Sequence, residues 1–251
     1  MGRRRSQQTF RDKGPVLGGN PTPGTLFVVG NVIGSPDDLS SRAVMILKNA
    51  SIIVAETPLH AQSLLVHHGI QATITSYGQS NQDEKIHVLL DRLAKGHNIA
   101  FLSDSGMPVI YDPGRRLIAA AQRRGSSVKV VPGPTALTAA IAVSGSSGDR
   151  FTFEGRLPRT NRRLDEFFKR FGKERRTLVF YAMPSSLQFI LKSLTRTLPA
   201  IHVTVAVNLT RTEERIYQGR PGELQQRIRS ISPKDEVTVV LDGNWRLREQ
   251  S

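Results

Sequence analysis

Four turns of the sequence concentrate the residue types that could bind a ligand or move a proton. Each turn follows an apolar run and is rich in Gly, Pro, Asp or Ser, which fix unusual backbone geometry and expose backbone polar groups. They lie at residues 30–38, 56–60, 103–114 and 132–136. Taken singly, each could be a structural turn. Four such turns at one edge of a sheet favour a binding cleft.

The strands and helices around these turns are predicted by the hydrophobic pattern between residues 24 and 145. Continuous apolar runs alternate with helical patterns, which is typical of a parallel sheet covered by helices on both faces. The carboxyl ends of parallel strands meet at one edge, so the four turns would lie together there. We expect strands at 25–29, 51–55, 72–76, 98–102 and 128–131, and helices at 41–48, 58–66, 81–95 and 114–124.

A linker-like run, Ser-Gly-Ser-Ser-Gly at 144–148, predicts the boundary between two α/β domains. In the second domain two consecutive strands, 202–207 and 215–217, predict a mixed sheet. We therefore expect a fold of two α/β domains with a cleft between them. The predicted division is a flexible basic arm at 1–23, domains at 24–145 and 149–245, and a tail at 246–251.

The composition excludes several kinds of chemistry. The 251 residues include no cysteine, which rules out disulfides, zinc–cysteine sites and thiolate nucleophiles. No glycine-rich dinucleotide or phosphate loop occurs, and the six histidines are scattered, so we expect no metal site. No apolar run approaches the roughly 20 residues that span a bilayer. These features indicate a cytoplasmic protein that does not enter a membrane.

The charge predicts a polyanionic partner. Lys plus Arg total 35 against 21 Asp plus Glu, a net charge of +14, which favours nucleic acid first and acidic membrane surfaces second. Nine basic residues fall between residues 156 and 176, against three acidic ones. The helical spacing of Phe167, Phe168 and Phe171 predicts core positions in this stretch. The phosphate-contacting candidates are Arg156, Arg159, Arg162 and Arg163.

The ordered motifs carry a family resemblance from Gly24 to about Gly243. Ser103-Asp104-Ser105-Gly106-Met107-Pro108 is followed by Asp112-Pro113-Gly114 and then by Pro132-Gly133-Pro134-Thr135-Ala136. In this order and spacing they resemble the tetrapyrrole methylase superfamily and, within it, the ribosomal RNA small subunit methyltransferase I family. The chain resembles a divergent member, because the family's helical C-terminal extension has no counterpart here.

The resemblance implies a homodimer that binds S-adenosylmethionine in the cleft between its two domains. It also implies methylation of a cytidine ribose 2′-hydroxyl in small-subunit ribosomal RNA, with that RNA or the 30S subunit as partner. The residues that the resemblance places along the methyl donor are Asp104, Ser105, Gly106, Met107, Pro132, Thr135, Ala136, Tyr181 and Leu209.

The sequence departs from the family pattern mainly where the acceptor would bind. Thr57-Pro58-Leu59 replaces the family's Asp-Thr-Arg, and Ala182-Met183-Pro184 follows Tyr181 in place of polar residues. A methyltransferase of a tetrapyrrole or another small molecule therefore stays an alternative. So does a catalytically silent RNA-binding or ribosome-assembly protein.

A ribose hydroxyl is a poor nucleophile, so a positioned base would assist in-line methyl transfer. We favour Glu56 as the catalytic residue, because it ends an apolar strand and would project into the cleft. Its alternative role is to cap the helix that follows. Asp37, Asp38 and His60 are assigned to the acceptor side, with helix capping or a solvated helix face as their alternatives.

Overall fold

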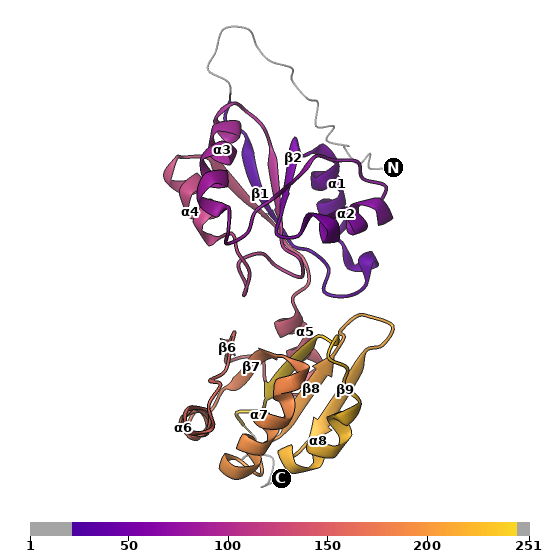
Figure 1. Ribbon diagram of the computed structural model, residues 1–251, viewed down its shortest axis with the longest axis vertical. Coiled ribbons are helices and arrows are strands. Elements are labelled where there is room, and N and C mark those ends of the chain that lie inside the picture. The colour runs from indigo at the N-terminus through magenta and orange to yellow at the C-terminus, as the bar shows by residue number, and fades with distance from the viewer. Residues whose placement is uncertain (1–21, 245–251) are drawn as a thin grey trace, which may run out of the picture.

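The computed structural model describes residues 22–244, which form two α/β lobes joined end to end (Figure 1). The predicted two-domain α/β fold is confirmed. Nearly all of the predicted basic arm and the whole tail at 246–251 lie outside the described residues. No helix among residues 22–244 is both long and apolar enough to cross a membrane.

The first lobe is built on a five-stranded parallel sheet in the order β3-β2-β4-β1-β5. The central strands β2 and β4 are buried along their whole length, as their continuous apolar sequences predict. Because the strands are parallel, their carboxyl ends share one edge, and the chain passes from that edge into the second lobe (Figure 1). The strands are β1 (Thr25–Val29), β2 (Ile52–Ala55), β3 (Ile74–Ser76), β4 (Ile99–Leu102) and β5 (Ser127–Val131).

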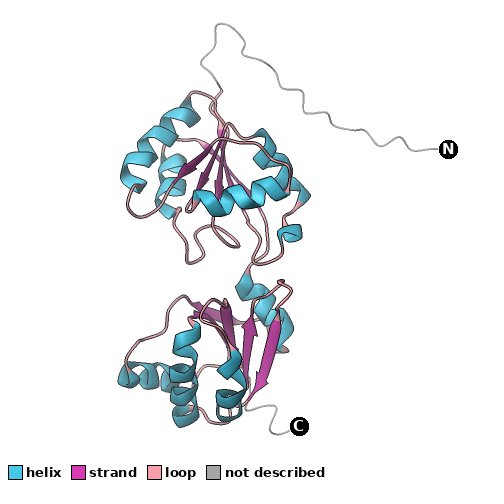
Figure 2. Cartoon of the chain, turned by 45° about the vertical axis from the view of Figure 1, so that its right-hand side comes forward, coloured by secondary structure: helices cyan, strands magenta, loops and turns pink. Residues whose placement is uncertain are grey.

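Helices cover both faces of this sheet, as Figure 2 shows. Leucines and alanines of α1 (Ser41–Asn49) and α2 (Pro58–His67) pack on one face. The other face is covered by α3 (Gln82–Ala94) and α4 (Arg115–Arg123). The short 3-10 helix η1 (Pro36–Asp38) precedes α1, whose N-terminus is capped by the Ser40 hydroxyl accepting from the backbone N–H of Ala43.

The second lobe has a mixed sheet in the order β6-β7-β10-β8-β9, which confirms the predicted mixture. β6 and β7 are parallel and every other neighbouring pair is antiparallel. The last strand of the described residues, β10, therefore lies in the middle of the sheet. The strands are β6 (Phe151–Glu154), β7 (Thr177–Ala182), β8 (Val203–Val207), β9 (Arg215–Gly219) and β10 (Val237–Leu241).

One face of the second sheet is covered by α6 (Asn161–Phe171), α7 (Pro184–Thr197) and α8 (Pro221–Arg227), with η2 (Ile228–Ser230) after α8. Phe168 and Phe171 are buried in this core and Phe167 packs against it, so these residues are core contacts, as predicted.

The opposite face of the second sheet is covered by α5 (Ala136–Ser144). Leu137, Ala140 and Ile141 of α5 pack against β7, β8 and β10. The division at residues 144–148 assigned this helix to the first domain, whereas its packing is with the second sheet. The chain thus passes between the lobes before α5, at the turn 132–135.

Candidate functional site

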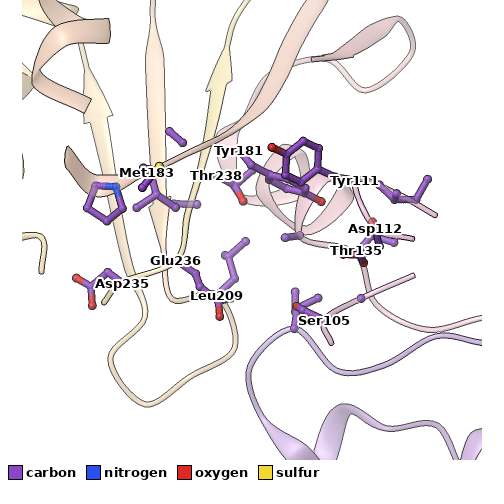
Figure 3. Close-up of a pocket in the computed structure, with 18 of the residues that line it drawn as sticks. Ser105, Tyr111, Asp112, Thr135, Tyr181, Met183, Leu209, Asp235, Glu236 and Thr238 are labelled. Atoms are coloured by element: carbon purple, nitrogen blue, oxygen red, sulfur yellow. The ribbon is translucent and has the colours of Figure 1, made fainter. Parts of the chain in front are cut away.

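A cleft of about 390 Å³ lies where the two lobes meet (Figure 3). This volume suits a small-molecule ligand. The first lobe contributes Ile33 and the loop after β4, while α5 contributes Thr135 and Ala136 at its N-terminus. The second lobe contributes the carboxyl ends of β7 and β8. The start of β10 joins them, because Val237 pairs in antiparallel register with both Ala182 and Val207.

Asn31 links two of the turns that border the cleft, those after β1 and β4. Its buried side-chain amide donates hydrogen bonds to the backbone oxygens of Ser103 and Asp104, at 2.8 and 3.0 Å. Its backbone N–H donates to the Gly106 oxygen at 2.8 Å, and the Gly106 N–H donates back to Val32 at 3.0 Å. Because buried amides are costly when unpaired, this arrangement fixes the turn after β4 on the turn after β1.

At two positions beside the cleft the backbone lies so close to another segment that only glycine fits. A Cβ on Gly30 would lie 2.6 Å from the Gly133 nitrogen, so the turns after β1 and β5 touch backbone to backbone. A Cβ on Gly34 would collide with the Leu209 carbonyl oxygen and lie 2.6 Å from the Thr210 hydroxyl. The N–H of Ser35 donates to that same hydroxyl at 2.9 Å. The turn after β1 is thus a direct contact between the lobes.

Within residues 22–244, four residues other than glycine have positive φ, and all four belong to loops that border the cleft. They are Val109 and Tyr111 in the loop after β4, with φ of 76° and 67°, and Asn208 and Thr210 in the loop after β8, with φ of 53° and 64°. Such conformations are uncommon, and they cost free energy above all for β-branched residues. All four strained positions thus lie in the two loops after β4 and β8.

Three carboxyl groups interact electrostatically beside the cleft. Asp112 lines the cleft, and burial, with the negative charges of Glu56 and Asp104, raises its pKa from 3.8 to about 7. The pKa of Glu56 is also raised, by burial first and then by the charge of Asp104. A carboxylate with a pKa near neutrality is suited to accept a proton.

Aromatic side chains line one side of the cleft. The ring of Tyr181 packs edge-on against Phe153 and Tyr111, with centroid distances of 5.0 and 6.0 Å. Burial raises the pKa of Tyr181, as does the charge of Asp112, so its hydroxyl is neutral and can donate. The Arg156 guanidinium lies over the Tyr111 ring, 5.3 Å from its centroid, and so joins the two lobes.

Most of the residues predicted to contact a donor are brought together in this cleft. Asp104 and Pro132 do not line it. The carboxylate of Asp104 is engaged by Thr57, whose N–H and hydroxyl donate to its two oxygens at 3.0 and 2.6 Å. The predicted donor-contacting residues that line the cleft are Ser105, Gly106, Met107, Thr135, Ala136, Tyr181 and Leu209.

The acceptor-side candidates are dispersed. Asp37 lies in η1 with its carboxylate 3.2 Å from the His67 ring, and Asp38 is its exposed neighbour. The His60 ring is 3.4 Å from the Asp104 carboxylate. Among the basic candidates Arg156 contacts a cleft residue, Tyr111. Arg162 pairs with Glu166 on the exposed face of α6, where Arg163 is also exposed, and Arg159 is exposed just before that helix.

Sequence reasoning did not assign a role to Asp112, to Pro233 or to residues 235–238, which line the cleft. Asp112 lies in one of the turns predicted to border the cleft, so its position in the sequence could have identified it as a site residue. Residues 233–238 lead into β10 and form its first two positions, and the antiparallel direction of β10 brings them to this edge. Among residues 22–244 no group of three or more His, Cys, Asp or Glu is arranged to hold a metal ion.

Known proteins share both the sequence and the fold. Residues 25–225 match the family of Tetrapyrrole (Corrin/Porphyrin) Methylases. A protein of Thermotoga maritima named ribosomal RNA small subunit methyltransferase I is 37% identical over 220 residues, covering 88% of this chain and 99% of that protein. A protein of the same name from Xylella fastidiosa is 36% identical over 225 residues, covering 88% and 82%.

A uroporphyrin-III C-methyltransferase from Thermus thermophilus, solved in complex with S-adenosyl homocysteine, has the same fold. Its TM-score is 0.61 at 20% identity, over 89% of this chain and 99% of that one. The matches in sequence and in fold agree with the family resemblance that the ordered motifs carry. The chain therefore belongs to the tetrapyrrole methylase family and, within it, to the ribosomal RNA small subunit methyltransferase I family.

Proposed function

We propose that this chain uses S-adenosylmethionine to methylate the ribose 2′-hydroxyl of a cytidine in small-subunit ribosomal RNA. The observation that carries the proposal is the cleft between the lobes, which gathers seven of the nine donor-contacting residues expected from the family pattern. The names of the curated relatives support the RNA substrate. The complex with S-adenosyl homocysteine in a protein of the same fold supports the donor.

The residues present fit a donor with one apolar and one polar end. Ile33, Ala206 and Leu209 offer apolar surface, and the Ser105 and Thr135 hydroxyls offer polar contacts. The donor, when bound, supplies a methyl group on a positively charged sulfur, which needs no metal for transfer. Asp112 places a carboxyl group on the same wall, where its negative charge would favour a cation.

We assign the general base to Asp112 rather than to Glu56. Formation of the new carbon–oxygen bond requires the hydroxyl proton to leave, and a base of pKa about 7 is matched to that step at neutral pH. Asp112 lines the cleft, whereas Glu56 influences Asp112 through the negative charge of the Glu56 carboxylate. Glu56 is thus a positioning residue that keeps Asp112 basic, and its own raised pKa leaves it the second candidate.

The charge of +14 and the exposed arginines of the second lobe support an RNA acceptor over a tetrapyrrole. We further expect a homodimer that works in the cytoplasm. Sedimentation equilibrium of the full chain tests the dimer, and a mass of one chain at micromolar concentration would contradict it.

The decisive experiment is methylation of small ribosomal subunits from cells that lack this protein, using radiolabelled S-adenosylmethionine. We expect label on one cytidine 2′-oxygen, and far less label with Asp112→Asn under the same conditions. Label on a different atom would change the acceptor. Donor binding by calorimetry without any transfer would favour a silent RNA-binding protein. Absence of donor binding would exclude the proposed activity.

A further inference from the structure

A second groove lies outside the cleft, between α3 and α4 on the first lobe, where the two helices run side by side (Figure 1). It encloses about 740 Å³. Its floor is made by Ile86 and Leu90 of α3 and by Ala119 and Ala120 of α4. The small alanine side chains leave the space that larger residues would fill, so the groove is a consequence of the α4 sequence.

Four arginines of α4 and its C-cap line this groove, in two rows along the helix. Arg116, Ala120 and Arg124 follow one another at intervals of four residues, and so share one face. Arg116 pairs with Asp83 of α3, and Arg124 pairs with Asp91 at 3.0 Å. This first row therefore fastens the two helices together.

The second row is Arg115, Ala119 and Arg123, also at intervals of four residues. Arg115 and Arg123 are exposed and line the groove. Neither forms an ion pair with any residue of the described part of the chain, 22–244. Eight residues of helix separate them by about 12 Å. The groove thus presents two unpaired guanidinium groups, spaced along its length, above an apolar floor.

This spacing favours an extended polyanion over a single phosphate. One phosphate can receive the fork of one guanidinium, whereas two arginines about 12 Å apart require negative charges repeated along a chain. A phosphodiester backbone has such repeated charge, and phosphate contacts of this kind position a nucleic acid without reading its sequence.

The loop after β4 leads along the chain from the cleft to the start of the groove. Arg115 follows Asp112, which lines the cleft, by three residues. Arg156 of the second lobe lies over the ring of Tyr111 in the same loop. Positive charge from both lobes therefore flanks the loop that carries Asp112.

We propose that the α3–α4 groove binds the phosphodiester backbone of the RNA strand that flanks the nucleotide entering the cleft. This inference rests on the proposed function for the identity of the RNA. Arg115 and Arg123 make the phosphate contacts, while Arg116 and Arg124 hold the helices that place them.

The test is the affinity of the full chain for labelled small-subunit ribosomal RNA, measured by filter binding across a range of salt concentrations. The variant is Arg115→Gln/Arg123→Gln. Its control is Lys192→Gln/Arg229→Gln, which removes the same charge from exposed positions of the second lobe. We expect the groove variant to bind about tenfold or more weakly than the control, and its salt slope to fall by roughly 1.5 from the loss of two phosphate contacts.

A second variant, Ala119→Glu, keeps every arginine and places a carboxylate between Arg115 and Arg123. It should weaken RNA binding in the same way. Thermal unfolding and donor calorimetry of each variant should match wild type, since none of these residues touches the cleft. If the wild-type chain methylates RNA but the groove and control variants bind RNA equally well, the groove proposal alone is wrong. A wild-type chain that transfers no methyl group, while the groove variant still loses RNA affinity, would overturn the proposed function alone.

Discussion

The carboxylate of Asp104 accepts two hydrogen bonds from Thr57, one from its backbone N–H at 3.0 Å and one from its hydroxyl at 2.6 Å. Thr57 is the N-cap residue of α2, so the turn after β4 holds the start of a helix that follows β2. The helix N-terminus in turn favours the negative charge of Asp104. That charge contributes to the raised pKa of Asp112.

Removing this charge should make Asp112 more acidic. In Asp104→Asn the coulombic repulsion disappears, so the pKa of Asp112 should fall below its value of about 7. Observation of the side-chain carboxyl carbons by NMR during a pH titration measures this directly. The hydrogen bonds to Thr57 are also weakened, which should lower the free energy of unfolding by about 1–3 kcal/mol. An unchanged Asp112 titration would show that the two carboxyl groups do not interact.

Methyl transfer should require the ionised form of Asp112. We therefore expect the rate in single turnovers to rise as the pH increases through about 7 and then to level off. Asp112→Asn should lower that rate by about 10²–10⁴-fold and abolish the rise. Glu56→Gln serves as the comparison: it should retain the pH-dependent rise but shift its midpoint downward, because Glu56 raises the pKa of Asp112. A rise that persists in Asp112→Asn and vanishes in Glu56→Gln would assign the base to Glu56.

The raised pKa of Asp112 also predicts a dependence of stability on pH. The folded protein holds the proton up to about pH 7, whereas the unfolded chain releases it near pH 3.8. The contribution of this group to folding is therefore most favourable at low pH and is lost between these two values as the pH rises. Asp112→Asn should then be more stable than wild type at pH 8 by about 1–3 kcal/mol, allowing for its half-buried position. Chemical denaturation at pH 8 tests the sign, and a destabilised variant would contradict it.

Contact between the lobes should depend on the absence of a side chain at residue 34. A Cβ in Gly34→Ala would meet the Leu209 oxygen and the Thr210 hydroxyl, so the turn after β1 and the loop after β8 must separate. We expect donor affinity to fall about tenfold or more, since both loops line the cleft. The matched control is Gly78→Ala, where a Cβ would have no heavy atom within 4 Å and the φ is not positive. Equal donor affinity in the two variants would show that the lobes adjust without cost.

An acid-sensitive contact supports the loop after β8. The Asn208 amide donates to Asp235 at 2.9 Å, and this bond, the Ser232 N–H and Arg215 lower the pKa of Asp235. A lowered pKa stabilises the fold at pH values above the ordinary 3.8, and the stabilisation is lost as the pH falls through the folded-state pKa. Asp235→Asn should reduce the free energy of unfolding by about 1–3 kcal/mol at pH 7 and by much less near pH 3. A difference that is constant with pH would exclude this origin.

The sequence predicted the first sheet and much of the cleft for a simple physical reason. Parallel strands such as β2 and β4 are buried on both faces, so their continuous apolar runs are recognisable, and their turns must share one edge. What escaped prediction depends on contacts distant in the chain. The helix at 136–144 is apolar on most sides, which shows that it is buried but not which sheet buries it.

Side-chain direction was likewise not readable from the sequence. Asp104 lies in the predicted turn, yet its carboxylate turns toward Thr57, which is 47 residues away. The part of the cleft wall at 233–238 follows from the antiparallel direction of β10, and no local pattern encodes that direction. The pKa of Asp112 depends on two other carboxyl groups from separate turns.

The central position of β10 also imposes an order on synthesis. β7 and β8 are joined only through β10, whereas the first sheet is complete once β5 has been made. A nascent chain can therefore fold its first lobe while the second still lacks its middle strand. The part of the cleft wall at residues 233–238 is synthesised together with β10. A growing polypeptide consequently has no complete cleft before β10 is available.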